Sequence, residues 1–197
     1  MISTEQIKEL RDRTVISVMQ CKKALEDAGG DPEKALSFLK KKGAEIADKK
    51  SERTLGAGVI RAYIHANGTV GAMVELNTET DFVAKNEEFS ALAYDIAMHV
   101  AAMKPEYVDD TQISDEAKEQ AKTLFAEEVE KMQKPEDIKV KVMEGKLATY
   151  FGEKTLLAQP FVKNQDETIA DLVKNATQKF GEKISVGRFA RFSVLGK

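Results

Sequence analysis

The chain is poor in the residues that most often build disulfide frameworks and metal centres. Its 197 residues include no tryptophan, two histidines and a single cysteine, Cys21. A single thiol excludes an internal disulfide and suits a reducing compartment. His65 and His99 lie far apart, with no ligand spacing around them. We therefore expect no metal site and no bound cofactor.

Long apolar runs are also missing. No segment could span a bilayer, and the N-terminal sequence MISTEQIKEL has no signal-like apolar stretch. We therefore expect a cytoplasmic protein that does not contact a membrane. The formal net charge of −3 argues against direct nucleic-acid binding driven by counterion release. This composition favours a globular protein that binds another protein.

The first part of the chain has the signals of three short helices. Ser3 and Gln6 have the spacing of a capping box, and Gly29-Gly30 is a suitable end for a second helix. Asp31-Pro32 begins a third helix, which we expect to end at Gly43. We predict a docking domain of the ubiquitin-associated type over residues 1–43 and a polar linker over 44–55.

Two strands with alternating apolar residues follow, over 59–65 and 69–76. A two-residue turn at Asn67-Gly68 would place Ile64 opposite Gly71. A three-residue loop would instead pair Ile64 with Val70, Ala62 with Ala72 and Ile60 with Val74. Because a buried face sets strand register, we favour the three-residue loop.

The remainder alternates between helical patterns and a closing strand. Helical spacing of apolar residues covers 89–100, with a stop at Lys104-Pro105, and then about 114–132, 136–151 and 169–180. Residues 184–194 alternate like a strand, except that Arg188 interrupts the pattern. The order of elements predicts an α+β fold in which helices pack on one face of an antiparallel sheet. We assign residues 56–197 to this core, with roles in partner binding and dimerisation.

The sequence lacks the residue patterns of a catalytic carboxylate pair and of a phosphate-binding loop. Adjacent carboxylates such as Glu87-Glu88 face different directions on a helix and do not form a catalytic pair. Gly56-Ala57-Gly58 precedes a strand and lacks the lysine of a phosphate-binding loop. We therefore expect neither catalysis nor direct nucleotide binding. Spacing alone favours Phe82 as a core aromatic residue at a helix start and Asp81 as an ordinary N-cap.

Four segments, in order along the chain, resemble the elongation factor Ts family. They are Val18-Met19-Gln20-Cys21-Lys22-Lys23-Ala24-Leu25, the decapeptide from Thr80 to Phe89 (TDFVAKNEEF), Glu144-Gly145-Lys146-Leu147 with the later Leu156 to Val162, and Val186-Gly187-Arg188-Phe189-Ala190-Arg191-Phe192. The resemblance covers roughly residues 1 to 195. It matches the short form of the family, which has one core module.

The resemblance implies a guanine-nucleotide exchange factor that associates with GDP-bound elongation factor Tu, dislodges its Mg²⁺ and promotes exchange of GDP for GTP. Thr80, Asp81, Phe82 and Val83 are the implied site of Mg²⁺ displacement. The N-terminal module is the implied anchor on the GTPase, through Val18, Met19, Lys22 and Lys23. A homodimer is also implied, because short members of the family resembling this chain act as dimers.

One segment departs from the family pattern, and one alternative function stays open. The sequence Thr14-Val15-Ile16-Ser17 stands where the family usually has a Thr-Gly-Ala-Gly turn, which puts the docking contacts of that turn in doubt. Ser17 still suits the N-cap of the second helix. The basic segment from Lys40 to Lys50 raises the alternative of a ribosome- or RNA-associated binding module, for which a steep salt dependence would be diagnostic.

Overall fold

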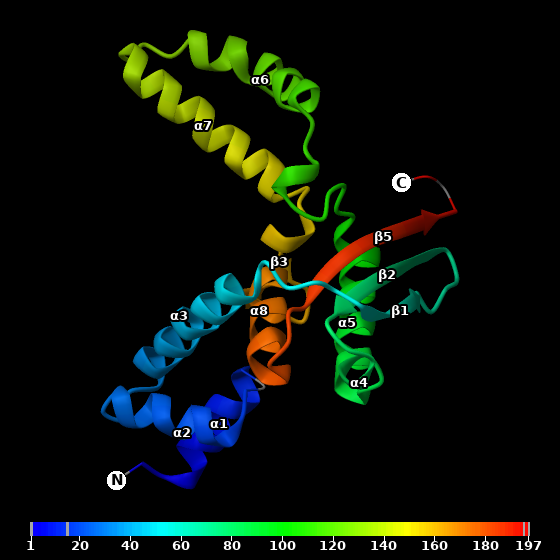
Figure 1. Ribbon diagram of the computed structural model, residues 1–197. Helices are drawn as coiled ribbons and strands as arrows, with labels where there is room; N and C mark the ends of the chain where they lie inside the picture. Colours follow the sequence, from blue (N-terminus) through cyan, green and yellow to red (C-terminus); the bar gives the residue numbers. More distant parts are fainter. Residues whose placement is uncertain (1, 15, 195, 197) are drawn as a thin grey trace.

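The computed structural model describes residues 2–14, 16–194 and 196, and combines a helical N-terminal part with an α+β core (Figure 1). The helices are α1 (Thr4–Thr14), α2 (Val18–Asp27), α3 (Pro32–Lys50), α4 (Asp81–Ala84), α5 (Glu87–Met103), α6 (Asp115–Glu130), α7 (Glu136–Gly152) and α8 (Ile169–Phe180), with 3-10 turns η1 (Asp110–Gln112) and η2 (Leu156–Ala158). The strands are β1 (Ala57–Ile64), β2 (Val70–Thr78), β3 (Pro160–Phe161), β4 (Asn164–Thr168) and β5 (Ser185–Ser193).

The N-terminal helices enclose a small core of their own. Leu10, Ile16, Cys21, Leu25 and Leu39 are buried together. The predicted caps are present: the Asp31 carboxylate accepts from the backbone amides of the first turn of α3, and Ser3 and Gln6 bond each other reciprocally. Three helices were therefore predicted correctly. The use of this unit as a docking domain stays a prediction.

The predicted end of the third helix at Gly43 is wrong, because α3 continues to Lys50. Gly43 is buried inside the helix, where α3 crosses α8. A Cβ atom at this position would lie 3.2 Å from the Oε1 atom of Gln178, so glycine permits the close approach and does not end the helix. Residues 44–50, expected to be linker, are thus helical, and Lys50 donates to the Gly181 carbonyl at 2.5 Å.

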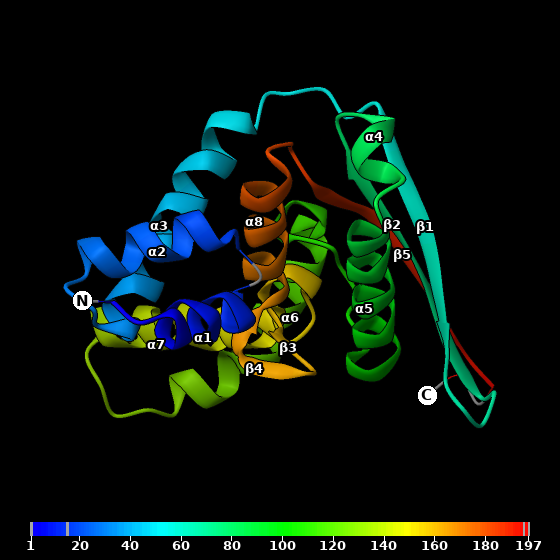
Figure 2. The ribbon, with the colours of Figure 1, turned by 90° about the horizontal axis from the view of Figure 1, so that it is seen from below.

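The core is a three-stranded antiparallel sheet in the order β1-β2-β5, covered on one face by α5. Val74 and Leu76 of β2 pack against Phe89, Ile96 and Val100 of α5, all fully buried. Figure 2 shows α5 along this face, with the opposite face of the sheet directed away from the described helices. The predicted α+β class and the one-sided packing are confirmed.

The preferred register of the β1–β2 hairpin is wrong. Ile64 lies opposite Gly71, Ala62 opposite Met73 and Ile60 opposite Glu75, which is the register expected for the two-residue turn. The connection spans residues 66–69, closed by a 2.8 Å bond from the His65 amide to the Val70 carbonyl. The apolar pattern misled because β1 carries apolar side chains on both faces, so burial does not decide which face turns inward.

A bulge in β5 explains the interruption at Arg188. Glu75 of β2 pairs with Arg188 and the next residue, Leu76, pairs with Val186, so Gly187 is the extra residue. The inserted residue reverses the alternation. Val186 remains buried, whereas the Arg188 side chain turns to the outer face and contacts the Glu75 carboxylate at 2.8 Å.

Helices α6 and α7 form a hairpin that projects from the core (Figure 1). Ser114 caps α6, and the two helices share a small cluster that includes Ala121 and Phe151. An ion pair between Lys146 and Glu128 at 2.8 Å joins them further along. The two predicted helical stretches divided by Pro135 are confirmed, and this hairpin lies apart from the sheet.

Candidate functional site

The predicted motif occupies the short helix α4, at the junction between β2 and α5. Its two central residues have opposite environments: Phe82 is 83% exposed, whereas Val83 is 4% exposed and belongs to the main core. The interpretation of Phe82 as a core aromatic residue is therefore wrong. A large apolar side chain that is exposed to solvent, next to a residue anchored in the core, is typical of a residue that contacts a partner.

Asp81 is exposed beside Phe82, at the first position of α4. Thr80, not Asp81, is the N-cap residue, so the capping role expected of Asp81 is wrong. The Lys85 ammonium donates to the Asp81 carboxylate at 2.6 Å. This hydrogen bond and the charge of Lys85 hold the pKa of Asp81 below its ordinary value. Asp81 therefore presents a carboxylate at neutral pH.

Thr80 connects α4 to a distant turn. Its hydroxyl and its amide both donate to Glu182, at 2.6 and 3.0 Å, and the Thr78 hydroxyl donates to the same carboxylate at 2.7 Å. Glu182 follows α8 directly after Gly181. Sequence reasoning missed Glu182, because the contact joins residues 102 positions apart and no local pattern marks it.

The predicted docking residues lie on α2, on the face directed away from the N-terminal core. Met19 is 77% exposed, Val18 is also exposed, and Lys22 and Lys23 follow one turn later on the same side. Cys21, between them in sequence, is fully buried as a small apolar residue, and burial raises the pKa of its thiol. The structure does not bring α2 and α4 together: Figures 1 and 2 place them at separate positions on the molecule.

The unusual turn before α2 is accommodated in the fold. Thr14 is buried and its hydroxyl donates to the Leu10 carbonyl at 2.7 Å, and Ile16 is buried in the N-terminal core. Ser17 caps α2 by accepting from the Gln20 amide at 3.3 Å, as predicted. Val15 lies outside the described residues. The turn thus contributes buried apolar surface.

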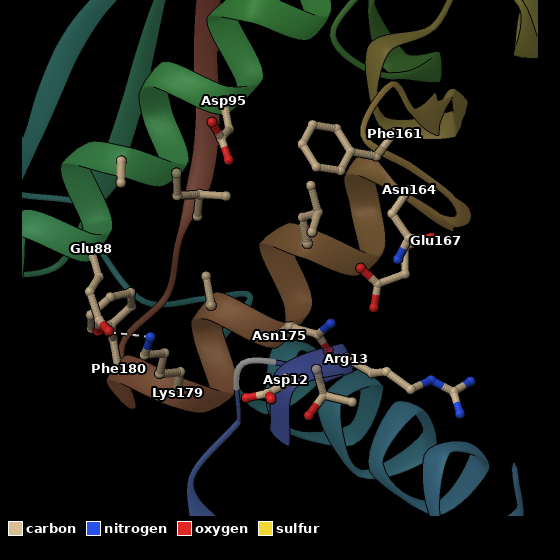
Figure 3. Close-up of a pocket in the computed structure, with 15 residues that line it drawn as sticks. Asp12, Arg13, Glu88, Asp95, Phe161, Asn164, Glu167, Asn175, Lys179 and Phe180 are labelled. Atoms are coloured by element: carbon tan, nitrogen blue, oxygen red, sulfur yellow. Dashed lines mark ion pairs between the residues drawn. The ribbon is translucent and has the colours of Figure 1, made fainter. Parts of the chain in front are cut away.

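A cavity of about 390 Å³ lies where α1 approaches the core (Figure 3). It lies between α1, α5, α8 and β4, and the ion pair of Glu88 with Lys179, 2.7 Å long, borders it. Burial raises the pKa of Glu167 at its wall, an effect that the charge of Lys40 only partly offsets. The exposed residues of α2 and α4 lie outside this cavity, so it is distinct from the predicted contact surfaces.

The described residues were also searched for groups that could bind a metal ion and for helices that could cross a membrane. Within residues 2–14, 16–194 and 196, the acidic, histidine and cysteine side chains nowhere gather in threes in a way that could hold a metal ion. No helix in those ranges combines the length and apolarity needed to cross a membrane.

Sequence comparisons identify the family of the chain. The family model described as "Elongation factor TS" matches residues 33–197. The chain belongs to the elongation factor Ts family. It is 46% identical over 194 residues to "Elongation factor Ts" of Thermosipho melanesiensis, covering 98% of this chain and 99% of the relative. It is 45% identical over 193 residues to the protein of the same name from Desulforamulus reducens, covering 98% and 89%.

A third relative extends the same result. "Elongation factor Ts" of Syntrophus aciditrophicus is 46% identical over 193 residues, covering 98% of this chain and 96% of the relative. As a member of the elongation factor Ts family, the chain is a nucleotide-exchange factor for elongation factor Tu in translation elongation.

Proposed function

We propose that Asp81 and Phe82 enter elongation factor Tu beside its bound Mg²⁺ and weaken the hold on GDP. The observation that carries this proposal is the exposure of Phe82 next to the buried Val83. A rigid scaffold with a projecting aromatic ring loses little side-chain entropy when the ring is inserted into a partner. The Asp81 carboxylate stands beside the ring and supplies an acceptor for donors that normally organise the nucleotide site.

Mg²⁺ is a suitable target for such an insertion. It requires near-ideal octahedral geometry, so a small displacement of its surroundings weakens its binding steeply. Once the metal leaves, much of the positive charge that holds the diphosphate is lost. In this proposal the exchange factor makes and breaks no covalent bond. It changes only the geometry around a metal that belongs to its partner.

Thermodynamic linkage sets the size of the required effect. The factor must bind nucleotide-free elongation factor Tu more tightly than the GDP-bound form. By linkage, the factor then lowers the affinity of elongation factor Tu for GDP by the same ratio by which GDP lowers its affinity for the factor. Each tenfold change in affinity requires about 1.4 kcal/mol, so a hundredfold effect requires about 2.8 kcal/mol. One inserted aromatic side chain with a docking surface is sufficient for that amount.

The exposed face of α2 is the surface through which we propose that this chain docks to the GTPase. Val18 and Met19 offer apolar contact area, and Lys22 and Lys23 add positive charge that steers association. Because α2 and α4 are separate parts of one molecule, binding through α2 raises the effective concentration of α4 near the nucleotide site. Docking and insertion are therefore separable by mutation.

The open face of the sheet is the proposed interface of a homodimer. Phe192 and Ile64 are 67% and 65% exposed on it. The apolar residues of this open face are Ile60, Ala62, Ile64, Met73, Ala190 and Phe192. A second copy would supply an equally apolar sheet for face-to-face packing. Each copy also carries Glu75 beside Arg188, so a two-fold arrangement offers opposite charges to both partners.

The alternative of an RNA-associated module receives less support. In the basic segment of α3, Lys50 already bonds the Gly181 carbonyl, and Lys40 interacts electrostatically with Glu167. Two lysines of the segment thus interact with other parts of the fold. Partner binding that changes little with salt fits a protein partner, whereas a steep salt slope on RNA would favour the alternative.

Release of labelled GDP from elongation factor Tu tests the proposed site. We expect the wild-type chain to accelerate release at sub-stoichiometric concentration. Phe82→Ala and Asp81→Ala should each reduce the acceleration and leave the circular dichroism spectrum unchanged. Lys8→Ala, an exposed change on α1, is the control and should behave as wild type. Unchanged exchange in both α4 variants would reject the insertion role.

A further inference from the structure

The helix that carries Asp81 and Phe82 is too short to hold its own direction. It contains four residues, and isolated helices of that length do not form in water. Its orientation therefore depends on what anchors its two ends. Val83 anchors the later part in the main core. At the start, the anchor is the bonding of Thr80 to Glu182.

Glu182 bonds both the end of β2 and the start of α4. One carboxylate oxygen accepts from the buried Thr78 hydroxyl and from the Thr80 amide, and the other accepts from the Thr80 hydroxyl. Hydrogen bonds to an ionised carboxylate are stronger than neutral ones. Burial opposes the ionisation of Glu182, but these hydrogen bonds outweigh it and hold its pKa below the ordinary value.

The turn after α8, which contains Glu182 and Lys183, makes further contacts with the residue that follows β2 and with the chain after α3. Glu79, between Thr78 and Thr80, accepts from the Lys183 amide at 2.5 Å and pairs with Arg53 at 3.1 Å. The Lys183 ammonium donates to the carbonyls of Ser51 and Arg53. The turn after α8 is therefore fixed to the chain that follows α3, and its position relative to β2 is determined from both directions.

We propose that Glu182 is a positioning residue for nucleotide exchange, which sets the direction in which α4 presents Asp81 and Phe82 to the GTPase. The proposal rests on the proposed function of α4. Glu182 bonds the amide and the hydroxyl of Thr80, the N-cap residue of α4, so its effect is exerted through Thr80. A misdirected Phe82 would still be exposed but would meet the partner in the wrong place, and misplacement of about 1 Å can reduce a rate by about 100-fold.

Graded variants separate this role from general stability. Glu182→Ala removes all three acceptor contacts, and Glu182→Gln keeps the size but loses the charge and one acceptor oxygen. Thr78→Val removes only the bond to β2 and leaves both bonds to Thr80, so it is the matched control. We expect the maximal rate of GDP release to fall by about tenfold for the alanine variant and less for glutamine. Thr78→Val should stay close to wild type.

Hydrogen exchange of the free protein supplies a measurement that does not need the GTPase. In Glu182→Ala and Glu182→Gln, the amides of residues 80–84 should exchange faster, while those in the middle of α5 and α8 stay protected. If the Glu182→Ala variant fails to fold, the Glu182→Gln variant is used to test the positioning role. A local loss of protection together with a lower maximal rate, at unchanged half-saturating concentration, supports positioning.

A combined variant distinguishes the possible failures. If Glu182 acts only by directing Asp81 and Phe82, adding Glu182→Ala to a variant that already carries Asp81→Ala and Phe82→Ala should slow exchange no further. Multiplied losses would overturn the positioning role, and so would wild-type exchange by Glu182→Ala. In either case a slow Phe82→Ala variant would leave the proposed function standing. If Phe82→Ala is also as fast as wild type, the proposed function of α4 itself is rejected.

Discussion

Phe82 and Val83 are adjacent in α4, yet the first side chain projects into solvent and the second is enclosed in the main core. A four-residue helix achieves this because successive side chains point in different directions around its axis. The proposed contact residue is therefore attached directly to the residue that fixes it. Under the proposed function, effects on exchange and on folding stability separate at these two positions.

Truncation to alanine should lower the stability of the fold at Val83 and leave it nearly unchanged at Phe82. We expect Val83→Ala to lower the free energy of unfolding by roughly 2 kcal/mol, through lost burial and a residual cavity. Phe82→Ala should change it by less than about 0.5 kcal/mol, as exposed substitutions do. Urea denaturation at constant m-value measures both. Equal destabilisation would show that Phe82 packs against the fold in solution.

The docking face of α2 should control association. We expect Lys22→Glu combined with Lys23→Glu to slow association with elongation factor Tu by roughly tenfold at low salt, because positive charge no longer steers the encounter. The difference should shrink as salt is added. Surface plasmon resonance measures the rates, and Lys8→Glu combined with Lys134→Glu, both at exposed positions outside α2, is the control for an equal charge change elsewhere. Equal slowing by the control would mean that only total charge matters.

The open face of the sheet should determine the oligomeric state. We expect the wild-type chain to sediment as a dimer, and Ile64→Glu or Phe192→Glu to sediment as a monomer, because each places a charge inside an apolar interface. Leu124→Glu is the matched control, since Leu124 is equally exposed at 63% but lies on α6. A monomeric wild-type chain at micromolar concentration would reject the dimer and leave the open face to another partner.

The buried His99 should make stability depend on pH. Its Nδ1 atom accepts from the Val162 amide at 3.2 Å, so the proton of the neutral ring lies on Nε2, which contacts Gln159 at 2.9 Å. Burial lowers the pKa of His99 below its ordinary 6.5, although the bond to Gln159 opposes the shift. Below pH 6.5 the unfolded chain then binds more protons than the folded chain, so protonation favours unfolding.

We therefore expect the His99 contribution to stability to be complete above pH 6.5 and to decline as the pH falls towards the lowered pKa of the folded state. The slope from this residue is at most about 1.4 kcal/mol per pH unit. Thermal or urea unfolding between pH 7 and pH 5, compared with His99→Gln, isolates it. Parallel pH profiles for the two proteins would contradict the assignment.

Local patterns predicted the elements of this fold better than their contacts. The caps at Asp31 and Ser17 and the stop at Lys104 were readable because each acts within a few residues. The hairpin register was not, since β1 has apolar residues on both of its faces. Gly43 resembled a helix end because its packing partner, Gln178, lies far away in the sequence. Predicting such positions requires knowing which helices cross.

The candidate site shows the same division. Resemblance to the elongation factor Ts family indicated Thr80 to Val83, but local spacing placed Phe82 in the core. Only the fold shows that Val83 supplies the core contact instead. Glu182 gave no signal at all, because an isolated glutamate after a helix-ending glycine is an ordinary surface pattern. Its role depends on the return of the chain to the end of β2.

The dependence of GDP release on Mg²⁺ tests the insertion of Asp81 and Phe82 most directly. The rate of labelled GDP release from elongation factor Tu is measured with and without this chain, at saturating Mg²⁺ and after chelation with EDTA. If displacement of the metal is part of exchange, the fold acceleration should be smaller in EDTA, and Phe82→Ala should lose activity mainly when Mg²⁺ is present. An equal fold acceleration under both conditions, with an equal defect of Phe82→Ala, would contradict the account.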